Sequence, residues 1–152
     1  MPVLKYLADT NSVSDFFRQI GPVRDWFSRH ADETGLSTIT LAELRRGIEL
    51  KPDGKARREL ERDYGFLLED YHGAIFDFDE AAAAEWGRFM AENKNHLPPY
   101  DDSLIAAIAR SSDLSVVTRN QRSLLAPCFV LVRASMACRQ VRVLMPVSLP
   151  AM

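Results

Sequence analysis

The 152-residue chain has only two cysteines, Cys128 and Cys138, and no long apolar run. Two ungrouped cysteines are too few for a disulfide framework and lack the paired spacing of a zinc site. The first apolar segment, residues 3–8, is interrupted by Lys5 and ended by Asp9, so it is too short for a signal-peptide core or a membrane span. These absences predict a protein of the reducing cytoplasm with no membrane attachment.

Acidic residues are absent from the last quarter of the chain. All 21 Asp and Glu residues lie in residues 1–113, which carry a net charge of −7, whereas residues 114–152 contain five arginines. The apolar share of 47% and the length suit one domain that buries roughly 70% of its unfolded surface. We expect this domain over residues 1–132 and an atypical basic tail over 133–152. The tail is either an arginine arm for RNA phosphates or the product of a late change of coding frame.

Apolar segments with strand and helix periodicity alternate along the chain. The predicted strands are 3–8, 36–40, 74–78, 114–117 and 129–132, and the predicted helices include 22–30, 55–71, 80–93 and 101–112. This alternation indicates an α/β domain with a mostly parallel sheet and helices on both faces. Ligands of such folds bind at the carboxyl ends of the strands. Trp86 falls on the apolar stripe of its helix, so we interpret it as core or dimer surface rather than as a base-stacking residue.

Three acids occupy corresponding positions in this scheme. Asp9 ends the first strand, Glu43 follows the second, and Asp102 begins the helix after a double proline. Carboxylates that share one crevice repel each other unless a cation lies between them, and hard oxygen ligands suit Mg²⁺ or Mn²⁺. Such a cation binds a phosphodiester oxygen and activates water. The pattern therefore predicts a divalent-metal site.

Each of these acids also has a purely structural explanation. The first turn of any helix favours acids through its dipole and its unpaired N–H groups. Thr40 and Glu43 have the spacing of a capping box at a helix start, Asp9 is placed to cap a helix, and Asp101 and Asp102 suit a helix dipole. The combination of the three acids, rather than any one of them, carries the prediction of a site.

Four segments of the sequence resemble one family. They are residues 7–11 (LADTN), 37–47 (STITLAELRRG), 102–107 (DSLIAA) and 116–120 (VVTRN). In this order and at this spacing they resemble PIN domains, specifically the VapC toxins of bacterial VapBC toxin–antitoxin pairs. The resemblance covers residues 4–120. It implies a three-layer α/β/α sandwich with a central, mostly parallel sheet of four or five strands.

The resemblance also implies an activity and partners. The expected activity is that of a Mg²⁺- or Mn²⁺-dependent endoribonuclease, silenced by a VapB-type antitoxin in the resting cell. A homodimer is expected, and operator DNA is contacted only indirectly, through the antitoxin. Family acids fall on Asp9, Glu43 and Asp102, with Asp101 only a neighbour of the matching position. Supporting polar groups fall on Asn11 and Thr118, and weaker candidates for contacts with substrate phosphate are Arg45, Arg46 and Arg119.

The chain departs from the family pattern at the fourth acid. The family carries this acid at the position of Asn120 or of Ser123, and neither residue is acidic here. We place Asn120 in the catalytic set and Ser123 beside it, because an amide or a hydroxyl holds a metal-bound water without adding negative charge. Weaker cation binding is expected, and the alternative function is a catalytically weakened or inactive PIN domain that still dimerises and binds its antitoxin.

A third possibility is a phosphoryl-transfer domain with Asp9 as the nucleophile. A dehalogenase-like site of this kind needs an acid at the position of Asn11, and a receiver-like site needs a lysine after Asp102. The chain has neither, so this reading is disfavoured.

Overall fold

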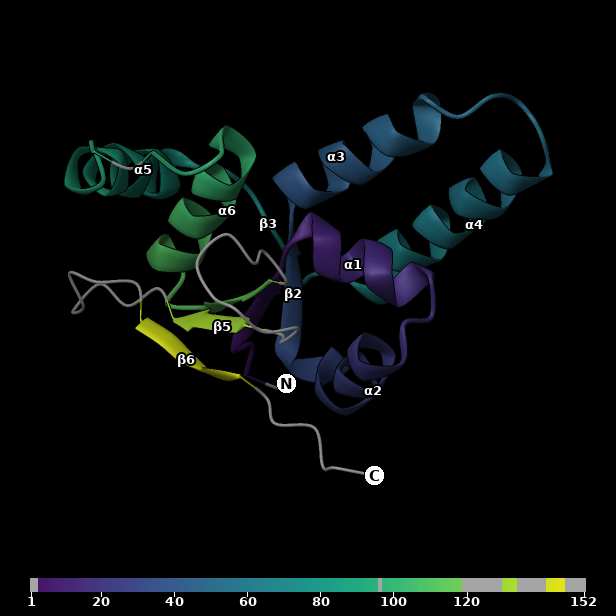
Figure 1. The fold of residues 1–152 in the computed structure, drawn as a ribbon, viewed down its shortest axis with the longest axis horizontal. Coiled ribbons are helices and arrows are strands. Elements are labelled where there is room, and N and C mark those ends of the chain that lie inside the picture. Colours follow the sequence, from purple (N-terminus) through teal and green to yellow (C-terminus); the bar gives the residue numbers. More distant parts are fainter. Residues whose placement is uncertain (1–2, 96, 119–129, 134–141, 147–152) are drawn as a thin grey trace.

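A six-stranded sheet forms the centre of the molecule (Figure 1). The structure, a computed structural model, describes residues 3–95, 97–118, 130–133 and 142–146. The strand order is β3-β2-β1-β4-β5-β6, in which the first four strands are parallel and the last two antiparallel. The strands are β1 (Tyr6–Ala8), β2 (Thr34–Ser37), β3 (Ile75–Phe76), β4 (Ser115–Thr118), β5 (Val130–Arg133) and β6 (Arg142–Pro146).

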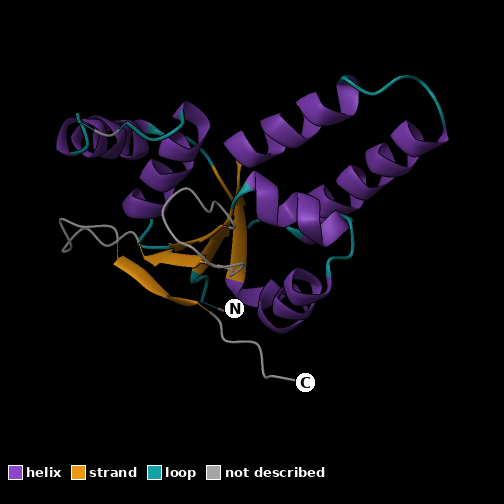
Figure 2. Ribbon diagram, viewed as in Figure 1, coloured by secondary structure: helices purple, strands orange, loops and turns teal. Residues whose placement is uncertain are grey.

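Helices cover both faces of this sheet. They are α1 (Thr10–Phe17), α2 (Gly21–His30), α3 (Thr38–Glu49), α4 (Lys55–Asp70), α5 (Glu80–Glu92) and α6 (Tyr100–Ser111). The first four pack on one face and the last two on the other, so the strands form the middle layer of three (Figure 2). The predicted α/β/α sandwich is thereby confirmed.

Alternation of side chains along the central strands divides the core into two parts. Ala8 and Val117 face the layer of α1 to α4, whereas Leu7 and Val116 face α5 and α6. All four are buried, as the period of two along a strand requires when both faces of a sheet are covered. The central strands are therefore apolar on both faces, and polar chemistry is confined to their ends.

Several predicted strand boundaries were wrong. The first strand begins at Tyr6 rather than at residue 3, the second is Thr34–Ser37 rather than 36–40, and the third is Ile75–Phe76 rather than 74–78. Helix α3 starts early because the Ser37 hydroxyl accepts a hydrogen bond from the Thr40 backbone N–H at 3.0 Å. Ser37 is thus the N-cap, and the predicted capping box of Thr40 and Glu43 does not exist.

The C-terminal strands extend the sheet beyond the expected number. Strand β5 overlaps the predicted fifth strand, 129–132, and ends one residue later at Arg133, whereas β6 lies within the predicted tail, 133–152. The division into a domain and a tail stays a prediction. No helix in the described ranges is both long and apolar enough to cross a membrane.

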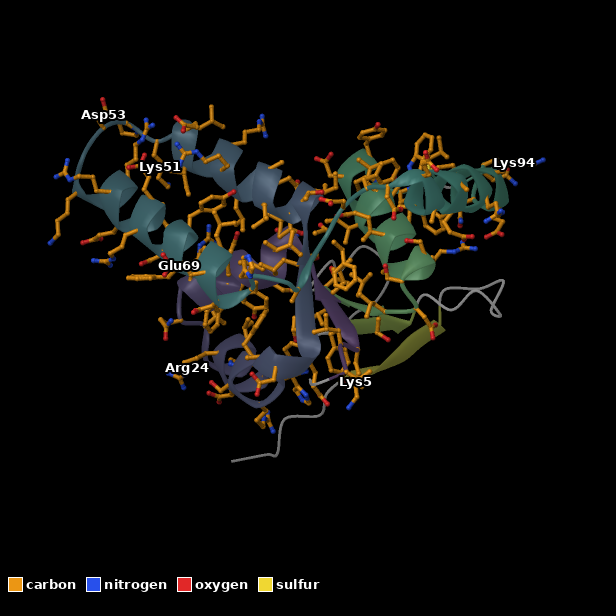
Figure 3. All side chains as sticks on the ribbon, turned by 180° about the vertical axis from the view of Figure 1, so that it is seen from behind. Lys5, Arg24, Lys51, Asp53, Glu69 and Lys94 are labelled. Carbon is orange, nitrogen blue, oxygen red and sulfur yellow. The ribbon has the colours of Figure 1, made fainter. Side chains whose placement is uncertain are left out.

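Charged side chains lie at the ends of the helices. Figure 3 shows Lys51 and Asp53 at the tip of the hairpin formed by α3 and α4, and Lys94 just beyond α5, all directed outward. These three residues are exposed. The carboxylates at the strand ends, described next, are more buried.

Candidate active site

The carboxyl ends of β1, β2 and β4 meet at one edge of the sheet. Ala8 is in register with both Leu36 and Val117, so the three parallel strands end at the same level. Helices α1 and α3 start directly after β1 and β2, and α6 packs against both β1 and β4 (Figure 1). The predicted acids therefore come to one edge, as the strand order required.

Asp9 is the most buried of the predicted site residues, with 3% of its surface exposed. Its Oδ1 accepts a hydrogen bond from the Ser12 N–H at 2.8 Å, so Asp9 caps α1. The Ser12 hydroxyl in turn donates to the Val117 carbonyl at 2.9 Å, which ties the start of α1 to the end of β4. Burial raises the pKa of Asp9, the charge of Asp102 raises it further, and hydrogen bonds from Ser12 and Thr118 oppose the shift.

Glu43 lies in the second turn of α3, where neither a cap nor the helix dipole explains an acid. Its carboxylate accepts a hydrogen bond from the hydroxyl of Thr10, the residue after Asp9. Burial raises the pKa of Glu43, as do the neighbouring charges of Asp101 and Asp102, against the Thr10 hydrogen bond. Glu43 therefore faces both α1 and the start of α6.

Asp102 links the two other acids. It is half-buried in the first turn of α6, and its charge acts on both Asp9 and Glu43. Asp101 is exposed and also acts on Glu43, through its charge and through a side-chain hydrogen bond. The three acids at family positions thus share one electrostatic environment, and Asp101 adds a fourth carboxylate to its rim.

The donor chemistry of this cluster fits a hard divalent cation. Asp9, Glu43 and Asp102 offer only oxygen ligands. Burial is the main cause of the raised pKa values of Asp9 and Glu43, and a bound cation relieves both this cost of a buried charge and the added repulsion from Asp102. Within the described ranges, however, no three His, Cys, Asp and Glu side chains already stand in an arrangement that could hold a metal ion. The three carboxylates therefore fit a hard divalent cation in their chemistry and charge, but in this structure their side chains do not converge on one point.

The other predicted site residues differ in their surroundings. Thr118 contacts Asp9, and Asn11 and Arg46 are exposed. Arg45 forms an ion pair with Glu49 one helical turn away. Three further candidates lie outside the described residues, namely Arg119, Asn120 and Ser123.

Sequence reasoning missed the hydroxyl groups that hold these carboxylates. In the first turn of α1, the Thr10 hydroxyl donates to Glu43, the Ser12 backbone N–H donates to Asp9, and the Ser12 hydroxyl donates to the Val117 carbonyl. Their position after Asp9 at a helix start was the available signal for the cap, but Glu43 and Val117, the partners of the two hydroxyls, lie on other elements. Asp101 was passed over because only its neighbour matches the family position.

Comparison with known proteins identifies the family. The PIN domain profile matches residues 6–126, and the chain belongs to the PIN-domain family. It is 36% identical over 126 residues to "Toxin FitB" of Neisseria gonorrhoeae, covering 79% of this chain and 91% of that protein. It is 32% identical over 123 residues to "tRNA(fMet)-specific endonuclease VapC" of Shigella flexneri, covering 79% and 89%.

Solved structures agree with the sequence comparison. The crystal structure of DNA-bound VapBC from Salmonella typhimurium matches with a TM-score of 0.68 and 28% identity, over 79% of this chain and 89% of that one. The predicted membership among VapC-like PIN domains is confirmed. PIN-domain nucleases generally use a divalent metal, in keeping with the oxygen donors described above.

Proposed function

We propose that the protein is the toxin of a type II toxin–antitoxin pair and acts as a metal-dependent endoribonuclease. The observation that carries this proposal is the charge of Asp102, which acts on both Asp9 and Glu43. Three acids from three separate elements thereby influence one another at the strand ends, which supports a shared site. The names of the relatives, a toxin and an endonuclease, support the same activity.

Asp9, Glu43 and Asp102 are the residues that would hold the cation, Mg²⁺ or Mn²⁺. When bound, the cation neutralises charge on the phosphodiester and lowers the pKa of water. The protein's own groups prepare this site, because Ser12 and Thr118 orient the Asp9 carboxylate and Thr10 orients that of Glu43.

RNA is the proposed substrate. Arg45, Arg46 and Arg119 are the candidates for its phosphates, although Arg45 must first leave its ion pair with Glu49. Contacts of this kind need only positive charge, so rising salt concentration is expected to weaken RNA binding steeply.

The proposed partners are a VapB-type antitoxin and a second copy of this chain. The structural relatives include VapBC and FitAB complexes bound to DNA. We propose the same assembly here, in the cytoplasm and without membrane contact, with operator DNA bound only through the antitoxin. Light scattering of the purified chain, with and without the antitoxin encoded beside it, tests both partners.

The experiment that tests the activity is cleavage of total cellular RNA by the purified chain with Mg²⁺ or Mn²⁺. Asp9→Asn and Asp102→Asn are the catalytic controls at matched salt, and the exposed Asp25→Asn on α2 is the neutral one. Cleavage that requires metal and is lost in both catalytic variants supports the proposal. A folded wild-type chain that cuts nothing with either metal contradicts it.

The alternative is a weakened PIN domain that retains its partners. The observation favouring it is the absence of an acid at Asn120 and Ser123. Asn120→Asp and Ser123→Asp are then expected to increase metal affinity and RNA cleavage. Unchanged affinity and cleavage in both variants count against this reading.

A further inference from the structure

A cavity of about 550 Å³ lies where α1, α3 and α4 meet (Figure 1). Thr10 and Glu43, which share a hydrogen bond, both belong to its wall. Thr10 directly follows Asp9, and Glu43 is itself one of the three clustered acids. The cavity therefore adjoins the candidate active site.

Two exposed cations stand further along the same cavity. Arg18 is the C-cap of α1, eight residues after Thr10, and Lys51 follows the C-cap of α3, eight residues after Glu43. Eight residues of helix rise by about 12 Å. The cavity thus extends from the acids at the helix starts to cations at the helix ends, with apolar side chains of α3 between them.

Helix periodicity decides which cations face this cavity. The α3 residues that line it share one face of the helix, at spacings of three and four: Glu43, Leu44, Gly47, Ile48 and Lys51. Arg45 and Arg46, the arginines expected from the sequence, are not among the described residues that line the cavity. The cations that the cavity brings toward Glu43 are Arg18 and Lys51.

Neither of these cations is neutralised by a neighbouring acid. Within the described ranges, no ion pair engages the Arg18 or the Lys51 side chain. Both are exposed, so each is available to a ligand without first breaking a salt bridge. Arg45 differs in this respect, because it is paired with Glu49.

Helix α4 contributes two acids to the cavity wall, and both already have partners. Glu59 forms an ion pair with Lys55 at 3.8 Å, and Asp63 forms one with Arg62 at 3.3 Å. Exposed pairs of this kind add little to stability, but each places a positive charge beside its acid. Away from the acidic cluster, the uncompensated charge of the cavity is therefore positive, which favours an anionic ligand over a basic one.

We propose that this cavity holds a single strand of the RNA next to the phosphate to be cut, with Arg18 and Lys51 bound to its backbone phosphates. The inference rests on the proposed ribonuclease function and makes it more specific, because it names the residues that hold the substrate beyond the metal. Proteins that bind single strands use positively charged grooves that follow the backbone. Contacts of this kind fix the position of the RNA without reading its sequence.

The test compares Arg18→Gln, Lys51→Gln and the double variant with Lys94→Gln. Lys94 is a matched control, because it is also exposed and Figure 3 shows it on the opposite side of the molecule from Lys51. The probe is a fluorescein-labelled, single-stranded RNA of mixed sequence. Its binding is measured by anisotropy with Mg²⁺ over a series of salt concentrations, in an Asp9→Asn background that prevents cleavage.

The salt dependence of binding reports the phosphate contacts directly. Each single substitution is expected to reduce the slope of log affinity against log salt concentration by about 0.7, and the double variant by about 1.4. At about 0.1 M salt, each is expected to weaken binding about two- to fivefold. In a chain with Asp9 intact, the double variant should raise the KM for cleavage and leave kcat unchanged. Lys94→Gln should change none of these values.

Substitution of the two α4 acids distinguishes RNA from a basic protein segment. Glu59→Gln combined with Asp63→Asn is expected to strengthen RNA binding, because it removes negative charge from the cavity wall. If this variant instead weakens binding of the antitoxin, and Arg18→Gln/Lys51→Gln leaves RNA binding unchanged, the proposal is overturned and the cavity is a protein interface. A salt slope and a KM that match those of Lys94→Gln also overturn it. A wild-type chain that binds RNA but does not cut it contradicts the nuclease function, whereas the slopes still decide the role of Arg18 and Lys51.

Discussion

Replacing Asp9 by asparagine is predicted to stabilise the metal-free protein while abolishing RNA cleavage. Asparagine keeps the side-chain oxygen that accepts from the Ser12 N–H, and Asn and Asp are equally good N-caps. The substitution removes a negative charge that is 97% buried and faces Asp102. Because burial is the main cause of the raised pKa, the ionised form of Asp9 is costly at neutral pH.

The size of the effect follows from what is lost and what is kept. The cap geometry survives, the charge-assisted part of the hydrogen bonds from Ser12 and Thr118 is lost, and one buried charge disappears with its repulsion. Substitutions that relieve such sites commonly add about 0.5 to 2 kcal/mol to the free energy of unfolding. In a domain of this size each kcal/mol raises Tm by about 2 to 4 °C, so Asp9→Asn should melt about 1 to 8 °C above wild type.

Thermal unfolding at pH 7, with EDTA and then with Mg²⁺, checks this prediction. A cation at about 100 times its Kd stabilises the wild-type chain by about 2.7 kcal/mol, and the variant that lacks a ligand should gain less. The difference in Tm between Asp9→Asn and wild type should therefore shrink or change sign when Mg²⁺ is added. Asp25→Asn, on the exposed face of α2, should melt like wild type under both conditions. A lower Tm for Asp9→Asn than for wild type in EDTA would refute the reasoning.

Three further predictions concern stability. The folded-state pKa values of Asp9 and Glu43 lie above their ordinary values of 3.8 and 4.5, so the metal-free folded chain holds more protons there than the unfolded chain. Their contribution to the free energy of unfolding therefore falls as the pH rises from the ordinary pKa values to the raised ones. The urea midpoints of wild type and Asp9→Asn should diverge over this pH range. Arg110→Met removes the 3.2 Å partner of the buried Glu85 and should cost about 3 kcal/mol in urea unfolding, partly recovered by adding Glu85→Gln. Gly35→Ala places a Cβ atom 2.6 Å from an aromatic carbon of β3 and 2.8 Å from a backbone carbonyl, so the urea midpoint should show a loss of about 1 to 3 kcal/mol.

The alternation of strands and helices along the chain, and with it the α/β class, could be predicted because the relevant signals are local. Apolar runs that end in an acid or a hydroxyl mark a strand followed by a helix start, as at Asp9. The end of β2 was misplaced because Thr40 and Glu43 mimic a capping box. Ser37 is the N-cap instead. It forms the last pair of β2 with β3, opposite Phe76, and the helix begins directly after it.

The three acids could be predicted as a set, from their combination at strand ends and helix starts, but the groups that hold them could not. Ser12 binds the carbonyl of Val117, which lies 105 residues away, and no periodicity in the sequence connects the two. The ring contact of Trp86 with Tyr100 is likewise set by the packing of α5 on α6. Such contacts depend on the relative position of two elements, which the strand order constrains but does not determine.

Asp9 and Glu85, two of the three buried carboxylates in the described part of the chain, are compensated in different ways. Glu85 is 4% exposed and is paired with the guanidinium of Arg110, so its charge is neutralised within the fold. Asp9 is buried to the same degree, but the groups that oppose its raised pKa are the neutral donors Ser12 and Thr118. Neutral donors orient a carboxylate without cancelling its charge, which leaves that charge available to a cation from solution. The pairing of Glu85 with Arg110 holds α5 to α6, and the uncancelled charge of Asp9 supports the proposal that Asp9 binds a cation.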